Sequence, residues 1–173
     1  MSAAKAAANA FRFGSIAIPS TQVFLQSSFS YGMVNLKPIR PGHVLLVTRR
    51  PCKRFADLTT EEVADLFAQG QRASRLVEKV YKAQGLTLCV QDGAVAGQTV
   101  PHVHLHVIPR HPGDFDENDQ IYEELEGRGV EVRKRSVDND ERKPRSAGDM
   151  ESEARMLRTE LSQLEGKEHL IVE

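Results

Sequence analysis

The sequence has no long apolar run and very little cysteine. Its apolar stretches are only a few residues long, whereas a helix that crosses a bilayer needs about 20, and no secretory apolar stretch follows Met1. We therefore expect a cytoplasmic protein, with the nucleus as a second compartment, and no membrane partner. The two cysteines, Cys52 and Cys89, show no CxxC spacing. Two cysteines can form at most one disulfide, which argues against a disulfide framework, and the lack of a CxxC pair argues against a thiolate zinc site.

Acidic residues are absent from the first third of the chain. The first is Asp57, and the residues before it carry eight Lys and Arg, although the whole chain has a net charge of only -1. A basic segment of this kind suits an anionic ligand, because it raises the local concentration of that ligand. An acid-free, Ala-rich start is also typical of a mitochondrial transit peptide, which stays open as the lesser alternative because a strand pattern begins near Phe11.

The pattern of apolar residues predicts one soluble domain with a tail. Thr59 and Glu62 form a capping-box pair, and apolar residues that include Phe67 follow at helical spacing up to Gly85, which we expect to end the helix. Pro41-Gly42 fits a type II turn between antiparallel strands. The expected strands cover residues 11–13, 23–25, 31–36, 43–48, 86–91 and 102–110, and a short helix covers 121–125.

Strands grouped around one long helix predict an α+β fold with a mainly antiparallel meander sheet and a C-terminal helix. We expect a flexible N-terminus at residues 1–10 and a domain at 11–126. The charged stretch 127–148 has almost no core-forming residues and is expected to be a disordered loop. Residues 149–173 are expected to form a helix that completes the domain, since Met150, Ala154, Leu157, Leu161 and Leu164 make one apolar stripe. Partner binding through this stripe is the alternative.

The chemistry is expected in the segment 101–108, Pro-His-Val-His-Leu-His-Val-Ile, which holds three of the six histidines. Side chains alternate between the faces of a strand, so His102, His104 and His106 would share one face. One alternative is that the row is simply an exposed face of the sheet, but lysine or threonine would serve there equally well. A metal site remains a second alternative, but alternate strand residues are about 6.6 Å apart, whereas zinc-bound nitrogens lie within roughly 3.5 Å of each other. A serine or cysteine hydrolase would need its own nucleophile signature, and no G-x-S-x-G is present.

The remaining interpretation makes a histidine the nucleophile. Imidazole has an unperturbed pKa of about 6.5, so much of it is neutral at physiological pH, and its nitrogen can attack phosphorus without a separate base. The resulting phosphoramidate is a good leaving group for water. Neighbouring imidazoles could stabilise negative charge on the transferring phosphoryl group.

The segment matches the H-φ-H-φ-H-φ-φ motif and resembles the histidine-triad (HIT) superfamily, in its fragile-histidine-triad (Fhit) branch of dinucleoside polyphosphate hydrolases. The similarity continues through residues 11–14, 34–38, 41–45, 62–67, 91–93, 96–100, 113–115, 118–119 and 121–125. Gln98 favours this branch over small phosphoramidase relatives, which usually carry a serine there. The chain departs from the branch in its long charged stretch and at Ile16, where a polar residue is expected.

The resemblance implies a HIT-like fold and hydrolysis of diadenosine triphosphate to AMP and ADP. His104 would attack the α-phosphorus and carry AMP covalently, while His102 orients its surroundings, His106 binds phosphate oxygens and His43 supports the row. For His43, a satisfied core histidine is the alternative. Gln98 would also act in catalysis. The substrate-binding residues implied are Asn35, Gln91, Gly97, Gln98, Thr99, Val100, His106, Phe13 and Leu45, the last two lining the adenine slot.

The same resemblance implies a homodimer whose sheets join, no nucleic-acid partner, and no protein-held metal. We expect no tightly bound cofactor, but a divalent cation, Mg²⁺ or Mn²⁺, that accompanies the substrate phosphates. Two other functions stay open: a nucleotide-binding signalling sensor with slow turnover, and a nucleoside phosphoramidase.

Overall fold

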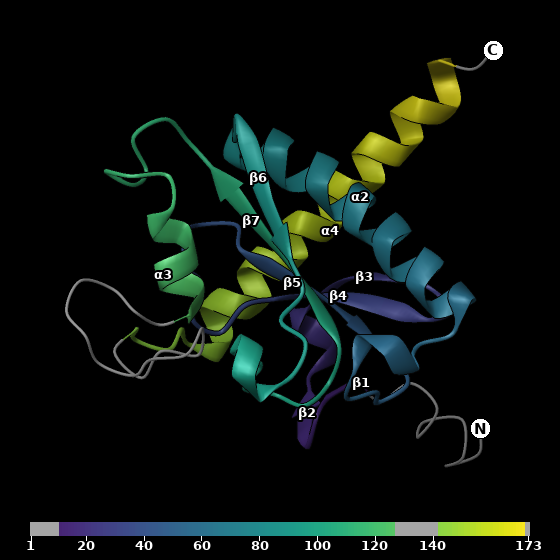
Figure 1. Ribbon diagram of the computed structural model, residues 1–173. Coiled ribbons are helices and arrows are strands. Elements are labelled where there is room, and N and C mark those ends of the chain that lie inside the picture. Colours follow the sequence, from purple (N-terminus) through teal and green to yellow (C-terminus); the bar gives the residue numbers. More distant parts are fainter. Residues whose placement is uncertain (1–10, 127–141, 172–173) are drawn as a thin grey trace.

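The computed structural model of the protein describes residues 11–126 and 142–171 (Figure 1). The expectations for residues 1–10 and 127–141 therefore lie outside the described residues. In chain order the elements are β1 (Phe11–Phe13), β2 (Ile16–Ile18), η1 (Ser20–Gln22), β3 (Val23–Gln26), β4 (Ser30–Val34), β5 (Val44–Thr48), η2 (Phe55–Asp57), α2 (Thr60–Tyr81), β6 (Gly85–Cys89), η3 (Ala94–Ala96), β7 (His104–Arg110), α3 (Gln120–Glu126) and α4 (Ala147–Ile171).

Five strands of the described chain form one antiparallel sheet in the order β3-β4-β5-β7-β6. After β5 the chain passes through α2 to the edge strand β6 and returns through β7, which lies between β5 and β6. Strands β1 and β2 pair as a separate hairpin. This arrangement confirms the predicted α+β fold, with a mainly antiparallel sheet, one long helix and a C-terminal helix.

Alternation along the central strands gives the sheet two different faces. Leu46 of β5 and Leu105 of β7 are register partners in the core beneath the helices, whereas Leu45 pairs with His106 on the opposite face. Successive side chains of a strand point to opposite faces, so one strand serves both purposes. The sheet therefore separates a hydrophobic core from the surface that carries the histidines.

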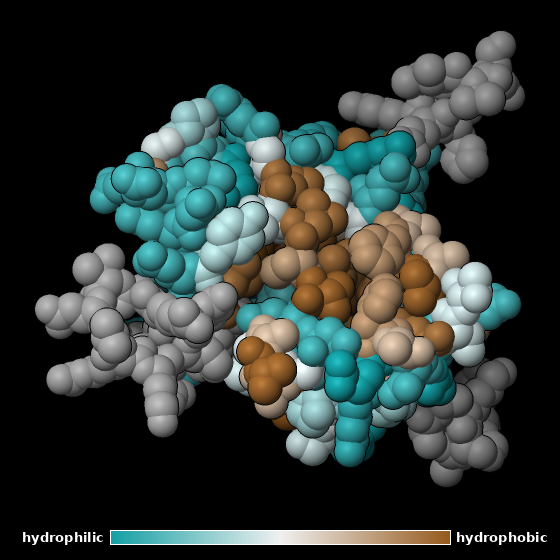
Figure 2. Space-filling view, viewed as in Figure 1, coloured by the Kyte–Doolittle hydropathy of each residue, from teal (hydrophilic) through white to brown (hydrophobic). Residues whose placement is uncertain are grey.

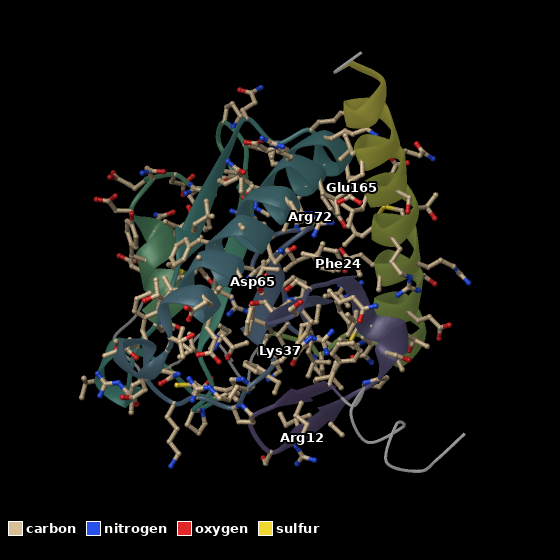
Figure 3. The ribbon with its side chains drawn as sticks, turned by 90° about the vertical axis from the view of Figure 1, so that its right-hand side faces the viewer. Arg12, Phe24, Lys37, Asp65, Arg72 and Glu165 are labelled. Atoms are coloured by element: carbon tan, nitrogen blue, oxygen red, sulfur yellow. The ribbon has the colours of Figure 1, made fainter. Side chains whose placement is uncertain are left out.

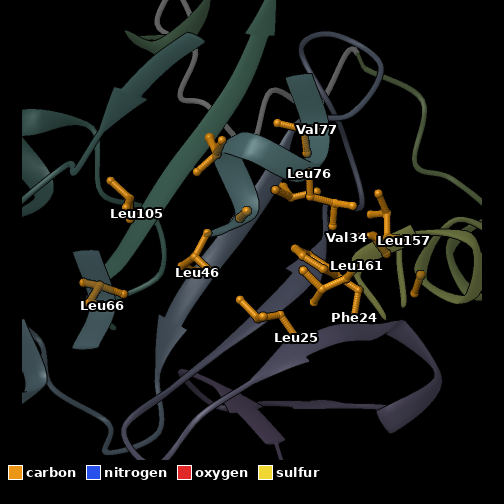
Figure 4. Packing of buried hydrophobic residues seen from close by; sticks show 14 of the residues in the cluster. Phe24, Leu25, Val34, Leu46, Leu66, Leu76, Val77, Leu105, Leu157 and Leu161 are labelled. Carbon is orange, nitrogen blue, oxygen red and sulfur yellow. The ribbon is translucent and has the colours of Figure 1, made fainter. Parts of the chain in front are cut away.

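The main core lies between the sheet and the helices α2 and α4 (Figure 4). Leu76 of α2 and Leu157 of α4 are both fully buried there. Each such side chain stabilises the fold by about 1.5–3 kcal/mol relative to leaving it in water. Residues from the two helices and four strands of the cluster include Leu66, Ala73, Val77, Leu161, Leu25, Val34, Leu46 and Leu105.

Helices α2 and α4 lie side by side on this face (Figure 3). Arg72 of α2 and Glu165 of α4 point toward one another and form an ion pair, and Lys79 bonds Glu160 at 2.8 Å. Exposed pairs of this kind contribute at most about 1 kcal/mol each, so the apolar stripe of α4 supplies most of the docking energy. No helix within the described ranges is long and apolar enough to cross a membrane.

Helix α2 begins as predicted and ends earlier than predicted. The Thr59 side chain accepts a bond from the backbone N–H of Glu62, and the Glu62 carboxylate accepts one from Thr59 N–H. At the other end Lys82 takes the left-handed conformation with φ 54° and caps the helix. The prediction that Gly85 ends the helix was wrong, because Gly85 is already the first residue of β6, paired with Arg110.

The predicted type II turn before β5 is confirmed. His43 N–H bonds the Arg40 carbonyl at 3.0 Å, and Gly42 has φ +82°. A side chain at this position would be strained, and its Cβ would lie 2.5 Å from the ring of Tyr81. Gly42 therefore lets α2 and this turn pack together.

Several other boundaries differ from the sequence prediction. Strand β2 was not predicted, and Phe67 of α2 is 47% exposed rather than part of the buried stripe. The last strand begins at His104, not His102. Residues 142–148 belong to the stretch expected to be a disordered loop, but they are ordered. Arg145 N–H bonds the Leu36 carbonyl at 3.0 Å, and α4 begins at Ala147.

Candidate active site

The histidines gather at β7, on the sheet face opposite the helices. His104 pairs with Val47 of β5, and His106 lies between Leu45 of β5 and Cys89 of β6. His102 belongs to the turn before the strand, where its N–H bonds the Val100 carbonyl at 2.8 Å. The three rings are still close, because the ring centroids of His104 and His106 are 4.7 Å apart and Phe13 contacts both His102 and His104.

His102 is fully buried, and both of its ring nitrogens are hydrogen-bonded. Nδ1 accepts the backbone N–H of Gly14 at 3.0 Å, so the proton of the neutral ring lies on Nε2, which donates to the Thr48 carbonyl at 2.8 Å. Such a ring has no nitrogen left for a substrate. Its carbonyl, however, reaches His104.

The His104 ring is oriented by that carbonyl. Its Nδ1 lies 2.7 Å from the His102 carbonyl oxygen and must donate to it, because a carbonyl only accepts. The neutral ring therefore keeps its lone pair on Nε2. Burial lowers the pKa of His104 to about 4, the hydrogen bond to His102 opposing this effect. His104 is thus neutral, with a nucleophilic nitrogen, at physiological pH.

A relay of hydrogen bonds from Ile39 through His43 determines which ring nitrogen of His106 carries the proton. Ile39 N–H donates to Nδ1 of His43 at 3.2 Å, which leaves the His43 proton on Nε2. Nε2 then donates to Nδ1 of His106 at 3.0 Å. The His106 proton therefore lies on Nε2, a buried atom with no partner in the described chain. An unpaired buried donor is costly, and a phosphoryl oxygen would satisfy it.

Burial keeps this relay neutral. It lowers the pKa of His43 to about 3, with further lowering by the charges of Arg142 and His104. Burial is also the largest cause that holds the pKa of His106 well below its usual value, followed by His104 and His43. Donation from His106 Nε2 to an oxyanion would therefore need no proton uptake from solvent.

An apolar pocket of about 460 Å³ lies next to this row. Phe13 and Leu45, predicted to line an adenine slot, are both in its wall, and Phe13 also makes an edge contact with His104 at 4.9 Å between centroids. The other lining residues are Ile16, Ala17, Ile18, Pro19, Gln22, Met33, Asn35, Leu36, Lys37, Val100 and Met150.

Asn35 links the pocket to the relay. Its Oδ1 accepts Lys37 N–H at 2.9 Å, and its amide nitrogen lies 3.5 Å from Nδ1 and 3.3 Å from Nε2 of His43. The residue is buried and directly follows β4, which ends at Val34. It can therefore contact a ligand that extends from the pocket toward His106.

Four of the predicted substrate-binding residues, Gln91, Gly97, Gln98 and Thr99, lie in the segment between β6 and β7. The Gln98 amide bonds the Gly93 N–H and the Lys53 carbonyl, and Thr99 is exposed. Gln91 donates to the Leu125 carbonyl at 3.1 Å and packs against Gly97, whose φ is +86°. Val100 lies in the pocket wall, but Gln91, Gly97, Gln98 and Thr99 do not.

Sequence reasoning missed several pocket residues. Ile18 lies on the unpredicted β2, and Met150 comes from α4, far along the chain. Met33 could have been found from the strand pattern, since it lies two residues after Tyr31 on the same face of β4 and is the register partner of Leu45. Among the described residues no group of three or more His, Cys, Asp or Glu is arranged to hold a metal ion.

The chain is similar to known proteins in sequence and in structure. A model of the HIT domain matches residues 18–113. The bifunctional bis(5'-adenosyl)-triphosphatase/adenylylsulfatase FHIT of Arabidopsis thaliana is 42% identical, covering 87% of this chain and 84% of that protein. The bis(5'-adenosyl)-triphosphatase of Dictyostelium discoideum is 44% identical, with 84% and 89% covered. The crystal structure of Plasmodium falciparum diadenosine triphosphate hydrolase in complex with cyclomarin A superposes with a TM-score of 0.70 at 29% identity, covering 90% and 86%.

Proposed function

The chain belongs to the HIT domain family, in its Fhit branch, and we propose that it hydrolyses diadenosine triphosphate to AMP and ADP through an AMP-histidine intermediate on His104. One observation carries the proposal: the His104 lone pair lies on Nε2, in the same row as the Nε2–H of His106, which has no partner among the described residues, and beside an apolar pocket. A nucleophile, an oxyanion donor and a nucleoside-sized cavity are thereby brought together.

In the first step, His104 Nε2 attacks the α-phosphorus. The P–N bond forms, the bond from phosphorus to the bridging oxygen breaks, and ADP leaves with that electron pair. The attacking ring becomes positive, and its Nδ1–H bond to the His102 carbonyl strengthens because the donor is then charged. His106 Nε2–H stabilises the negative phosphoryl oxygens.

In the second step, water attacks the same phosphorus from solution. The P–N bond breaks, its electron pair returns to Nε2, the proton that the water loses goes to solvent, and AMP is released. Because burial holds the pKa of His104 at about 4, the ring returns to its neutral form without titrating near pH 7. Dividing one displacement into two is the usual advantage of covalent catalysis.

We place one adenosine in the pocket against Phe13 and Leu45, with Asn35 as a ribose contact. The leaving phosphates would extend toward the loop that holds Gln91, Gly97, Gln98 and Thr99. For Gln98 to reach them, its amide must exchange the bonds to Gly93 and Lys53 for substrate oxygens. We expect Mg²⁺ or Mn²⁺ to arrive with these phosphates, as oxygen ligands suit such cations.

The free thiols of Cys52 and Cys89 support a cytoplasmic location.

Incubation with diadenosine triphosphate in ¹⁸O-water tests the reaction. We expect AMP plus ADP, with the solvent oxygen in AMP alone, at a turnover of about 1–1000 per second. Diadenosine tetraphosphate, run in parallel, gives the preferred chain length. Label mainly in ADP would contradict attack at the α-phosphorus. Tight binding with turnover far below this range would favour the sensor function instead.

We also propose that two copies pair through the edge strand β6. Leu88 of β6 is 45% exposed and, together with Phe67 of α2, Phe55 and Val90, lines a mainly apolar hollow. Figure 2 shows apolar side chains gathered in a band over this side of the molecule. Unpaired backbone groups of an edge strand favour pairing, and a two-fold axis would join both sheets and cover both patches.

Leu88→Glu should therefore convert a dimer into monomers, because two carboxylates would face each other across the two-fold axis. Met156→Glu is the matched control, since Met156 is an exposed apolar residue on α4 away from this patch. Light scattering should give twice the 19.3 kDa chain mass for the unaltered protein and for the control. A monomeric unaltered protein, or a dimeric Leu88→Glu variant, would contradict pairing through β6.

A further inference from the structure

The pocket that we assign to adenosine contains few polar side chains. Of its lining residues, those with polar side chains are Gln22, Asn35 and Lys37. Asn35 already bonds Lys37 N–H and contacts His43. Lys37 has an interaction of its own, and an ammonium only donates, so it cannot accept a bond from an amino group. The remaining polar side chain is Gln22, whose amide forms no hydrogen bond within the described part of the chain.

The backbone around Gln22 is held in place from both sides. Gln22 ends the short η1 turn, where its N–H bonds the Pro19 carbonyl at 3.0 Å. Arg158 of α4 donates to the Thr21 carbonyl at 3.4 Å and to the Val23 carbonyl at 2.6 Å. One guanidinium therefore hydrogen-bonds the backbone carbonyls of the residues before and after Gln22. A side chain on a fixed backbone can bind a ligand with less ordering cost.

We propose that Gln22 selects adenine as the base in this pocket. Its amide offers one donor and one acceptor side by side, and adenine presents the complementary pair, the N6 amino group and N7, at one edge. Guanine presents two acceptors, O6 and N7, at the same edge, so the amide oxygen would face an acceptor. The apolar wall of Phe13, Ile16 and Leu45 distinguishes two purines of nearly equal shape only weakly.

This inference rests on the proposed function, because it takes the pocket to be the nucleoside site. It goes beyond that function by naming one residue that sets the base preference. A contact to the base lies far from the reacting phosphorus and acts equally in ground and transition states. Its loss should therefore raise KM and leave kcat nearly unchanged.

Two variants and one control test the proposal with diadenosine and diguanosine triphosphate. Gln22→Leu should lower kcat/KM for the adenine substrate by about 10-fold or more, through KM, and leave the guanine substrate within about twofold. Gln22→Glu keeps the size but loses the N–H donor, and should lose as much adenine preference. Gln26→Leu removes a glutamine from the neighbouring strand β3 outside the pocket wall and should change neither substrate.

Equal losses for adenine and guanine substrates, or no loss for either, would overturn the assignment. Thermal unfolding of each variant shows whether a loss comes from misfolding, which would lower activity toward both bases. Binding of AMP and GMP, measured by calorimetry, separates this inference from the proposed reaction. If neither dinucleotide is hydrolysed, the reaction is wrong, yet a preference for AMP that Gln22→Leu abolishes would still support Gln22. Equal affinity of the unaltered protein for AMP and GMP would reject it.

Discussion

Replacing His104 with asparagine should abolish turnover of diadenosine triphosphate, by on the order of 10⁴-fold or more, while the intact substrate still binds. Asparagine is polar and of similar reach but cannot form a phosphoramidate, so the AMP-protein adduct should disappear with the activity. The pocket wall formed by Phe13 and Leu45 is unchanged. Rapid acid quench with intact-protein mass measures the adduct, and calorimetry measures the binding.

His111→Asn provides the matched control, because His111 is an exposed histidine that follows β7 and lies outside the relay. It should retain full activity and adduct. An adduct that persists in His104→Asn at another residue would show that the nucleophile was assigned to the wrong histidine. Complete loss of substrate affinity with the fold intact would show that His104 acts in binding rather than in attack.

His106→Asn should lower kcat by about 100- to 1000-fold and leave a detectable adduct. The residue supplies the Nε2–H that the relay from Ile39 through His43 holds in place, and it forms no bond to phosphorus. Losing one oxyanion donor slows both steps but prevents neither. Single-turnover measurements at acid quench give the rate of adduct formation. Activity within about twofold of the unaltered protein would exclude the donor role.

The same replacement at His102 separates positioning from charge stabilisation. His102→Asn also falls in the range of about 100- to 1000-fold, but for another reason, since both ring nitrogens of His102 bond the protein backbone. It should lower the melting temperature as well as kcat. If His102→Asn and His106→Asn lower thermal stability equally, their roles are not distinguished by these contacts.

The strand pattern predicted how the side chains of β7 divide between the two faces of the sheet, because alternation on a strand is a local property. Leu105 and Val107 face the core, while His104 and His106 lie on the opposite face of the sheet, as expected from their spacing. His102 was placed on the strand in error. Pro101 lacks an N–H for a sheet ladder, and the chain turns there before β7 begins.

The remaining differences come from weak or distant signals. Strand β2 has three residues and no buried position, so it shows no alternation to detect. Ser146 bonds the N–H of Asp149 and begins the last helix, but this cap is surrounded by charged residues that resemble a disordered loop. The apolar stripe predicted that the last helix docks on the domain, but it does not encode where, so the position of Met150 in the pocket wall could not be predicted.

The docking of α4 and the binding of a nucleotide are thermodynamically coupled. Met150 lines the pocket and Arg158 holds the turn that carries Gln22, so a ligand that needs both can bind well only to molecules in which α4 is seated. By thermodynamic linkage, the ligand then stabilises that seating by the same amount. Partial opening of the C-terminal helix becomes an equilibrium that competes directly with substrate, and occupancy of the site protects α4 from local unfolding.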